Sequence, residues 1–174
     1  MKNVTASEIR RSIVNGSRRE VSDMVVPADL EALDWEGLEF LGWRDTKAPL
    51  RGYIVYLLDD ELVGIILRAA ETASSRRKSA MCQLCRVPRP SDEVTLFTAR
   101  RAGHAGREMN TVGTYICADL NCSDHARVVP ARTPLRPDPH LVMEQHVAGL
   151  NNRTRAFLAS VLQTVPASPS ACAT

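Results

Sequence analysis

Four cysteines in two close pairs constrain the fold of this chain more than any other feature. The first pair is Cys82-x2-Cys85 and the second is Cys117-x4-Cys122. A structural Zn²⁺ ion takes four soft ligands in a tetrahedron, with zinc–sulfur distances of roughly 2.3 Å. A short turn presents two thiolates to one side of such a site, and a second pair from a distant segment closes it. The spacing therefore predicts one structural zinc ion held by these four cysteines.

Two other interpretations of the cysteines stay open, namely disulfide pairing and buried thiols that share no role. Disulfides are typical of small secreted domains. The first sixteen residues, MKNVTASEIRRSIVNG, mix basic and acidic side chains and contain no apolar run. They do not resemble a signal peptide. We therefore favour the metal site, and we expect the protein to be cytoplasmic.

Two further residues bear on the metal site. His125 follows Cys122 by three positions and offers an alternative to one thiolate. Four cysteines already fill a closed tetrahedral site, however, and leave no open position for a bound water. We therefore expect the zinc to be structural and the protein to have no enzymatic activity. The fifth cysteine, Cys172, lies in a tail rich in proline, serine and alanine, where we expect a free thiol without a role.

Basic residues gather around the cysteines, although the chain as a whole is almost neutral. The formal net charge is +2, but eight basic residues between positions 76 and 107 are accompanied by only two acidic ones. Most of them are arginines, whose planar side chains make forked contacts with carboxylates and phosphates. We predict a partner-binding surface on or beside the finger, made by Arg100, Arg101, His104, Arg107 and Tyr115. Composition leaves open an acidic protein partner, an RNA partner, and a solvated basic surface without a partner.

The rest of the chain predicts short helices and paired strands, from apolar periodicity and from capping and turn residues. Helices are expected over Thr5–Asn15, from about Ala28, within Asp119–Arg127 and over Leu141–Val165, with Gly149 and Asn151-Asn152 weakening the last one. Strands are expected over Gly52–Leu58 and Leu62–Leu67, joined at Asp59-Asp60-Glu61, and over Val94–Ala99 and Thr111–Cys117, joined by a basic loop, Arg100–Asn110. The aromatic segment Trp35–Trp43 is expected to complete the core.

These elements together predict an α+β fold. It consists of an antiparallel β-sheet with a four-cysteine treble-clef zinc finger, short N-terminal helices and a long C-terminal helix. We expect an N-terminal helical segment over residues 1–37, an α/β and zinc-finger domain over 38–127, and a linker and packed C-terminal helix over 128–165. Residues 166–174 are expected to be disordered.

Several motifs occur in an order that resembles a known family. They are Phe40-Leu-Gly-Trp-Arg-Asp45, Tyr53-Ile-Val-Tyr56 with Leu62-Val-Gly-Ile65, Cys82-x2-Cys85, Val94-Thr-Leu-Phe97, and Gly113-Thr-Tyr-Ile-Cys-Ala-Asp119-x2-Cys122. This set resembles the C-terminal treble-clef zinc-finger domain of the FusB-type elongation factor G-binding proteins. The resemblance covers roughly Leu38 to Arg127, about half of the chain.

The resemblance implies a cytoplasmic, non-enzymatic adaptor that binds elongation factor G through its zinc-finger domain. In the resistance proteins this binding frees the factor from ribosomes stalled by fusidic acid. Those proteins carry a helical bundle ahead of the domain, whereas about 37 residues precede the matching region here. We therefore expect factor binding that modulates release of the factor from the ribosome, and the sequence leaves open whether the chain confers resistance to fusidic acid. The alternative hypothesis is a zinc-finger protein that contacts ribosomal RNA through the arginine-rich surface.

Overall fold

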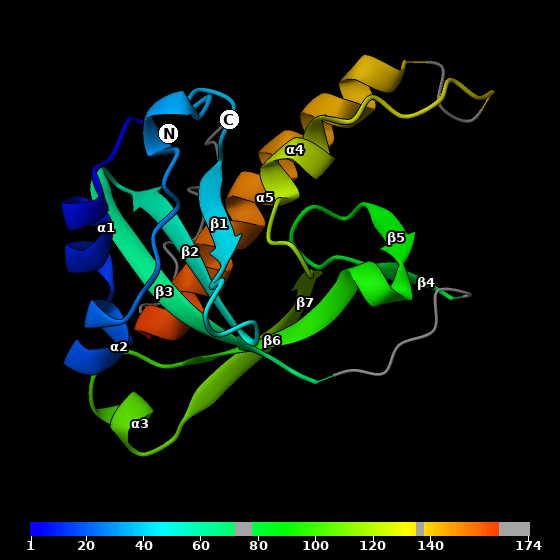
Figure 1. The fold of residues 1–174 in the computed structure, drawn as a ribbon. Helices are drawn as coiled ribbons and strands as arrows, with labels where there is room; N and C mark the ends of the chain where they lie inside the picture. Colours follow the sequence, from blue (N-terminus) through cyan, green and yellow to red (C-terminus); the bar gives the residue numbers. More distant parts are fainter. Residues whose placement is uncertain (72–77, 135–137, 164–174) are drawn as a thin grey trace, which may run out of the picture.

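The computed structural model describes residues 1–71, 78–134 and 138–163, and a five-stranded antiparallel sheet forms its centre (Figure 1). The strand order is β1-β2-β3-β6-β7. These strands are β1 (Phe40–Arg44), β2 (Arg51–Leu58), β3 (Glu61–Ala69), β6 (Val94–Arg100) and β7 (Thr111–Cys117). A separate ribbon pairs β4 (Ser79–Met81) with β5 (Pro88–Pro90). The helices are α1 (Ala6–Ser12), α2 (Arg18–Ser22), α3 (Gly103–Arg107), α4 (Cys122–Arg127) and α5 (Pro139–Leu162).

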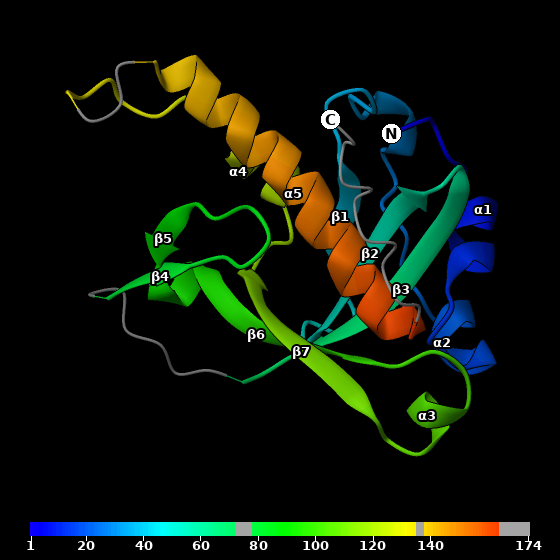
Figure 2. The same ribbon diagram turned by 180° about the vertical axis from the view of Figure 1, so that it is seen from behind.

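The hairpin of β2 and β3 confirms the strands expected from the β-branched and aromatic runs. Its turn residues, Asp59 and Asp60, both have positive φ angles, of 47° and 67°. A two-residue turn with this geometry matches the twist of antiparallel strands, and aspartate tolerates it better than most residues. By contrast, β3 and β6 share only two residue pairs, Arg68 with Thr98 and Ala69 with Phe97. The β6–β7 hairpin therefore diverges from the rest of the sheet, as Figures 1 and 2 show.

One face of the sheet packs against α5, which crosses it in Figure 2. Alternate residues of the strands point to this face, because the side-chain period of a strand is two. The buried set includes Ile54, Ile65, Leu67 and Phe97 from the strands, Leu150, Leu158 and Val161 from α5, and the four cysteines. We call this set the cysteine-side core. The finger is thus part of the main core rather than an appendage to it.

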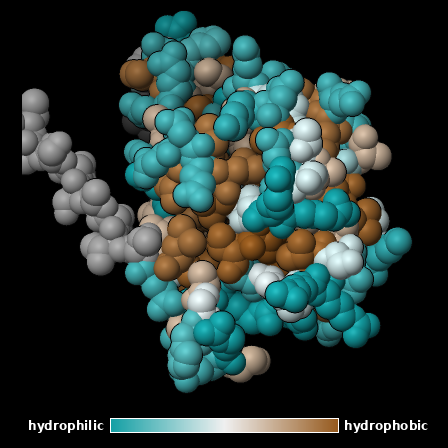
Figure 3. All heavy atoms as spheres, turned by 90° about the vertical axis from the view of Figure 1, so that its left-hand side faces the viewer, coloured by the Kyte–Doolittle hydropathy of each residue, from teal (hydrophilic) through white to brown (hydrophobic). Residues whose placement is uncertain are grey.

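The opposite face of β1, β2 and β3 is covered by the N-terminal segment. Ile9, Met24 and Trp35 pack there on a second set of strand residues, Leu41, Trp43, Tyr53, Val55 and Ile66. We call this second set the N-terminal core. Figure 3, which views the side of α1, shows apolar surface between the hydrophilic side chains that surround it. Capping boxes at Thr5–Glu8 and Ser17–Glu20 begin the two short helices of this segment.

The structure departs from the sequence expectations in four elements. The second helix begins at Arg18 rather than near Ala28, where only a 3-10 turn forms at Leu30–Ala32. The segment after Leu38 forms an edge strand, β1, and the expected basic loop contains α3. The C-terminal helix continues without a break through Gly149. Residues 166–174 lie outside the described residues, and no helix within the described ones is long and apolar enough to cross a membrane.

Candidate metal centre

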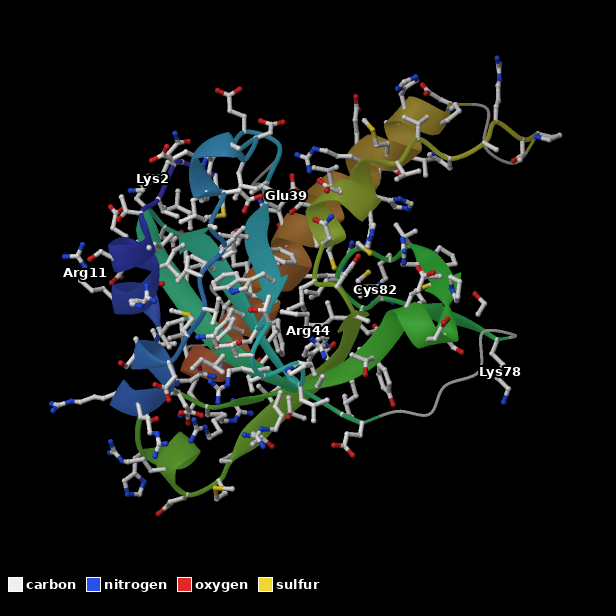
Figure 4. The ribbon with its side chains drawn as sticks, viewed as in Figure 1. Lys2, Arg11, Glu39, Arg44, Lys78 and Cys82 are labelled. Carbon is white, nitrogen blue, oxygen red and sulfur yellow. The ribbon has the colours of Figure 1, made fainter. Side chains whose placement is uncertain are left out.

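The four predicted cysteines come together at the junction of three elements. Cys82 and Cys85 lie in the turn after β4, Cys117 ends β7, and Cys122 begins α4, and Figure 4 labels Cys82 there. All four are buried, with 0% exposure. The sulfur atoms of Cys82 and Cys122 lie 3.6 Å apart, and those of Cys85 and Cys117 lie 3.7 Å apart. Two zinc–sulfur bonds of roughly 2.3 Å at the tetrahedral angle separate their sulfurs by about 3.8 Å. The cluster therefore fits a zinc site.

Backbone geometry shapes the turn that carries the first pair. The amide of Cys85 donates to Cys82 Sγ at 3.4 Å, and the amide of Arg86 donates to the carbonyl of Cys82 at 3.0 Å. Arg86 has a φ angle of 62°, which reverses the chain directly after the second ligand. The amide of Gln83 donates to the carbonyl of Tyr115 at 2.8 Å. This last bond fixes the turn on the edge of β7, two residues before Cys117.

The electrostatics of four adjacent sulfurs favour a bound cation. The neighbouring sulfurs, Cys117 first, together with Cys82, Cys85 and burial, raise the pKa of Cys122 well above the usual value for a thiol. Hydrogen bonds from Cys117, Cys122 and Cys85 lower the pKa of Cys82. Hydrogen bonds from Cys117 and Cys122 also lower the pKa of Cys85, whereas the pKa of Cys117 is raised. The cluster thus favours two thiolates and resists a third and a fourth, because like charges repel in a buried site. A divalent ion removes this conflict and allows all four to act as ligands.

The helix that carries Cys122 is anchored on the edge strand β1. The guanidinium of Arg127 binds Glu39 in a forked ion pair, with distances of 2.5 Å and 2.6 Å, and Figure 4 labels Glu39. The hydroxyl of Ser123 accepts from the amide of Glu39 and donates to the carbonyl of Phe40, both at 3.2 Å. Forked pairs of this kind fix orientation as well as distance. The sheet therefore helps to position α4 through contacts that do not involve the sulfurs.

His125 contacts the cluster but lies beside it. Its Nδ1 is 3.3 Å from Cys117 Sγ, and its Nε2 is 3.3 Å from a carboxylate oxygen of Asp119. A thiolate only accepts hydrogen bonds, so the imidazole donates to Cys117 when that sulfur binds metal. His125 thus lies next to one metal ligand, Cys117, and the four sulfurs themselves are the ligands of the site.

Arg153 of α5 is a residue near this centre that the sequence reasoning missed. Its Nε donates at 2.5 Å to the carbonyl of Leu84, between the two cysteines of the first turn. A Cβ atom at Gly149 would lie 2.5 Å from the Arg153 guanidinium, so the glycine leaves room for that side chain. The available signal was a glycine four positions before an arginine in a helix, which puts both on one face.

The five predicted partner-binding residues divide into two groups in space. Arg100 pairs with Thr111 at one end of the β6–β7 hairpin, and Cys117 pairs with Val94 at the other end. Six residues of strand separate these ends by roughly 20 Å. Arg100, Arg101, His104 and Arg107 therefore lie at or near α3, away from the finger, as Figure 1 shows. The expectation that they lie beside the finger was wrong, because β6 and β7 carry the loop outward, and only Tyr115 lies near the cysteines.

Most of the predicted surface also makes contacts within the protein. Arg100 forms an ion pair with Glu20, and His104 Nδ1 lies 3.6 Å from a carboxylate oxygen of Glu108. Arg101 donates to the carbonyl of Ser160 near the end of α5. Tyr115, in contrast, is 52% exposed, and Arg107 is exposed as well.

Comparison with known proteins identifies a family. The chain matches the FBP C-terminal treble-clef zinc-finger family over residues 8–161. The match extends well beyond the motifs at residues 38–127 and includes most of the N-terminal segment and most of α5. Neither the curated proteins nor the solved structures gave a match to the chain. Sequence, fold and cysteine geometry agree with the matched description, and the chain belongs to the FBP C-terminal treble-clef zinc-finger family.

Proposed function

We propose that this protein is a non-enzymatic adaptor that binds translation elongation factor G and modulates its release from the ribosome. The observation that carries the proposal is the family match over residues 8–161, because the FusB-type members of this family act in that way. Cys82, Cys85, Cys117 and Cys122 hold one structural zinc ion in this proposal. The zinc supports the shape of the binding domain and takes no part in chemistry.

The location of the metal centre suits such a role. The four cysteines share one buried core with the sheet and α5, and α4 is tied to β1 through Arg127 and Glu39. A partner would therefore meet the finger and the sheet as a single surface. The β6–β7 hairpin alone spans roughly 20 Å. A standard protein interface buries about 800 Å² on each side, which corresponds to a patch about 30 Å across, so the hairpin covers a large part of such a width.

Within this surface we assign direct contact to the two most available of the predicted residues. Tyr115 is 52% exposed on β7, and Arg107 of α3 is exposed and takes part in none of the ion pairs between described residues. Tyrosine and arginine are also the side chains that most often dominate protein interfaces. Arg100, Arg101 and His104 complete the surface. The contacts of Arg100 with Glu20 and of Arg101 with the carbonyl of Ser160 tie the segment before α3 to the rest of the protein.

The first experiment is calorimetric titration of the zinc-loaded protein with purified elongation factor G from the same organism. We expect saturable one-to-one binding at about 50 mM and about 200 mM salt. The double variant Arg107→Met/Tyr115→Ala should weaken binding by about tenfold or more. Arg155→Met, which changes an exposed arginine on α5, is the matched control and should bind like the parent protein.

The absence of binding with zinc fully loaded would remove this function from the chain. Ribosomal RNA would then become the leading partner, and the same titration with ribosomes would test it. RNA binding weakens steeply with salt, since each neutralised phosphate releases counterions. A protein interface with an apolar centre weakens less.

A further inference from the structure

Arg153 connects the long C-terminal helix to the turn that carries the first pair of cysteines. Its Nε donates to the carbonyl of Leu84 at 2.5 Å, and Leu84 lies between Cys82 and Cys85. Its Nη2 is buried and has no hydrogen-bond partner among the described residues. A buried charged donor without an acceptor is costly. The position of this donor therefore points to the neighbouring sulfurs as its electrostatic partner.

Gly149 makes room for this contact one helical turn earlier. A Cβ atom there would lie 2.5 Å from Arg153 Nη1 and 2.8 Å from Nη2. The guanidinium thus folds back over the bare backbone of α5 to reach the finger. Glycine destabilises the interior of a helix relative to alanine. Its use at this position is explained by the path that it opens for the arginine side chain.

The charges around the site favour the same assignment. Four thiolates and one Zn²⁺ ion carry a net negative charge, and all four cysteines are buried. Burial lowers the pKa of Arg153, and the positive charge of the exposed Arg86 lowers it further. Negative charge on Cys85 and Cys82 raises it. No described carboxylate forms an ion pair with Arg153 among the pairs of the structure. The sulfurs are its natural counter-charge.

We propose that Arg153 is the counter-cation of the zinc–thiolate centre, and that metal binding in turn holds the middle of α5 on the finger. Two groups that stabilise each other do so reciprocally. Loss of Arg153 therefore weakens zinc binding, and loss of zinc loosens α5. Neither effect depends on the partner proposed above, because both involve only the metal centre and α5.

Four single variants separate the charge of Arg153 from its packing. Arg153→Met removes the charge and keeps an apolar stem, whereas Arg153→Lys keeps a charge without the forked geometry. Gly149→Ala keeps the arginine but displaces its guanidinium, because the new Cβ occupies the space of Nη1. Arg155→Met is the matched control, since Arg155 lies two positions further along α5 and pairs with Asp59 at the surface.

Zinc affinity is measured by competition with a chelator of known affinity. Residues that support metal ligands typically change affinity by about 10–100-fold when substituted. We expect a loss in this range for Arg153→Met and for Gly149→Ala, a smaller loss for Arg153→Lys, and no change for Arg155→Met. The double variant Gly149→Ala/Arg153→Met should lose no more than Arg153→Met alone. Equal affinities for Arg153→Met and Arg155→Met, or additive losses in the double variant, would overturn the proposal.

Two further readouts distinguish a charge effect from a packing defect. With cobalt(II) in place of zinc, the sulfur-to-metal charge-transfer band should move to lower energy in Arg153→Met, because the thiolates lose a neighbouring positive charge. Arg153→Lys should restore part of the shift, and an unchanged band in Arg153→Met would contradict the charge assignment. Amide hydrogen exchange around Leu150 and Leu158 should accelerate when the parent protein is stripped of zinc. Unchanged exchange there would refute the coupling to α5.

Discussion

The cysteine-side core contains four metal-ligand side chains, whereas the N-terminal core on the opposite face is closed by packing and by hydrogen bonds within the chain. In the N-terminal core, the indole of Trp43 donates to the carbonyl of Val25 at 2.8 Å, and that of Trp35 donates to the carbonyl of Leu30 at 3.0 Å. Tyr53 donates to the buried carboxylate of Asp45 at 2.8 Å. One face of the same sheet thus depends on a cation, and the other depends only on the chain itself.

This difference teaches that one sheet can combine two sources of stability. A packed core loses stability gradually as side chains are trimmed, because each atom contributes a small share. A metal centre is lost as a unit, because its ligands lose their common partner together. Perturbing each side separately should therefore give different kinds of response.

The largest effect is expected from Cys82→Ser or Cys117→Ser. Apparent binding free energies of roughly 10–16 kcal/mol become folding free energy in zinc-finger modules, which rivals the total stability of a typical domain. Either variant should lose zinc and the cooperative unfolding of the cysteine-side core. The zinc-to-protein ratio and thermal unfolding measure this, with Cys172→Ser as a control that keeps its zinc. A full zinc ratio in both variants would refute the ligand assignment.

Trp43→Ala probes the N-terminal core. The indole stacks on Tyr53 with ring centroids 4.8 Å apart, and it is 8% exposed. Its truncation should lower the free energy of unfolding by about 3–5 kcal/mol, as for other large aromatic side chains. Urea denaturation measures the loss, and Trp43→Phe should lose much less. Zinc content should stay complete, and its loss would mean that the two cores do not respond separately.

Arg127→Met tests the join between the finger and the edge of the sheet. The side chain of Glu39 is only 8% exposed, and the substitution leaves its carboxylate without a partner. We expect a loss of about 2 kcal/mol, in the range for hydrogen bonds to charged groups. A double-mutant cycle with Glu39→Gln should show strong coupling in denaturant unfolding. Additive losses would show that the ion pair contributes little.

The smallest effect is expected from Glu20→Gln, and it depends on pH. Burial raises the pKa of Glu20, but hydrogen bonds from Ser17 and the ion pair with Arg100 outweigh it and lower the pKa to about 2. Because this pKa is lowered, the charged form of Glu20 stabilises the fold at pH values above the unfolded pKa of 4.5. This stability is lost as the pH falls toward 2. After allowance for solvent screening, we expect a difference of about 1 kcal/mol from the parent protein at pH 7. Unfolding at several pH values should show this difference shrinking below pH 4.5, and a constant difference would contradict the charge explanation.

The sequence was most informative where local chemistry decides the structure. The cysteine spacing, the turn at Asp59-Asp60 and the alternation in β6 and β7 all act over a few residues, and the structure confirms them. The capping box at Ser17 and Glu20 was an equally local signal for α2. It was overlooked because the apolar periodicity around it is weak.

Features set by distant parts of the chain could not be predicted in the same way. Gly42 in β1 lies so close to the finger that a Cβ there would be 2.4 Å from the carbonyl oxygen of Leu120. No pattern near Gly42 reveals a neighbour 78 positions away. The ion pair of Arg100 was equally hard to predict, since its partner Glu20 lies 80 positions earlier. A count of positive charges overestimates a binding surface when tertiary contacts engage some of them.

The two-pair junction between β3 and β6 has a consequence for the order of folding. The hairpin of β2 and β3 closes through a two-residue turn, whereas Arg68 must find Thr98 across 30 residues of chain. Local hairpins form within microseconds, and long-range pairings wait for larger loops to close. We expect the β1–β3 meander to assemble first, with the β6–β7 hairpin and the four cysteines of the finger joining afterwards. Slow metal delivery would then trap a half-folded chain whose first three strands are already in place.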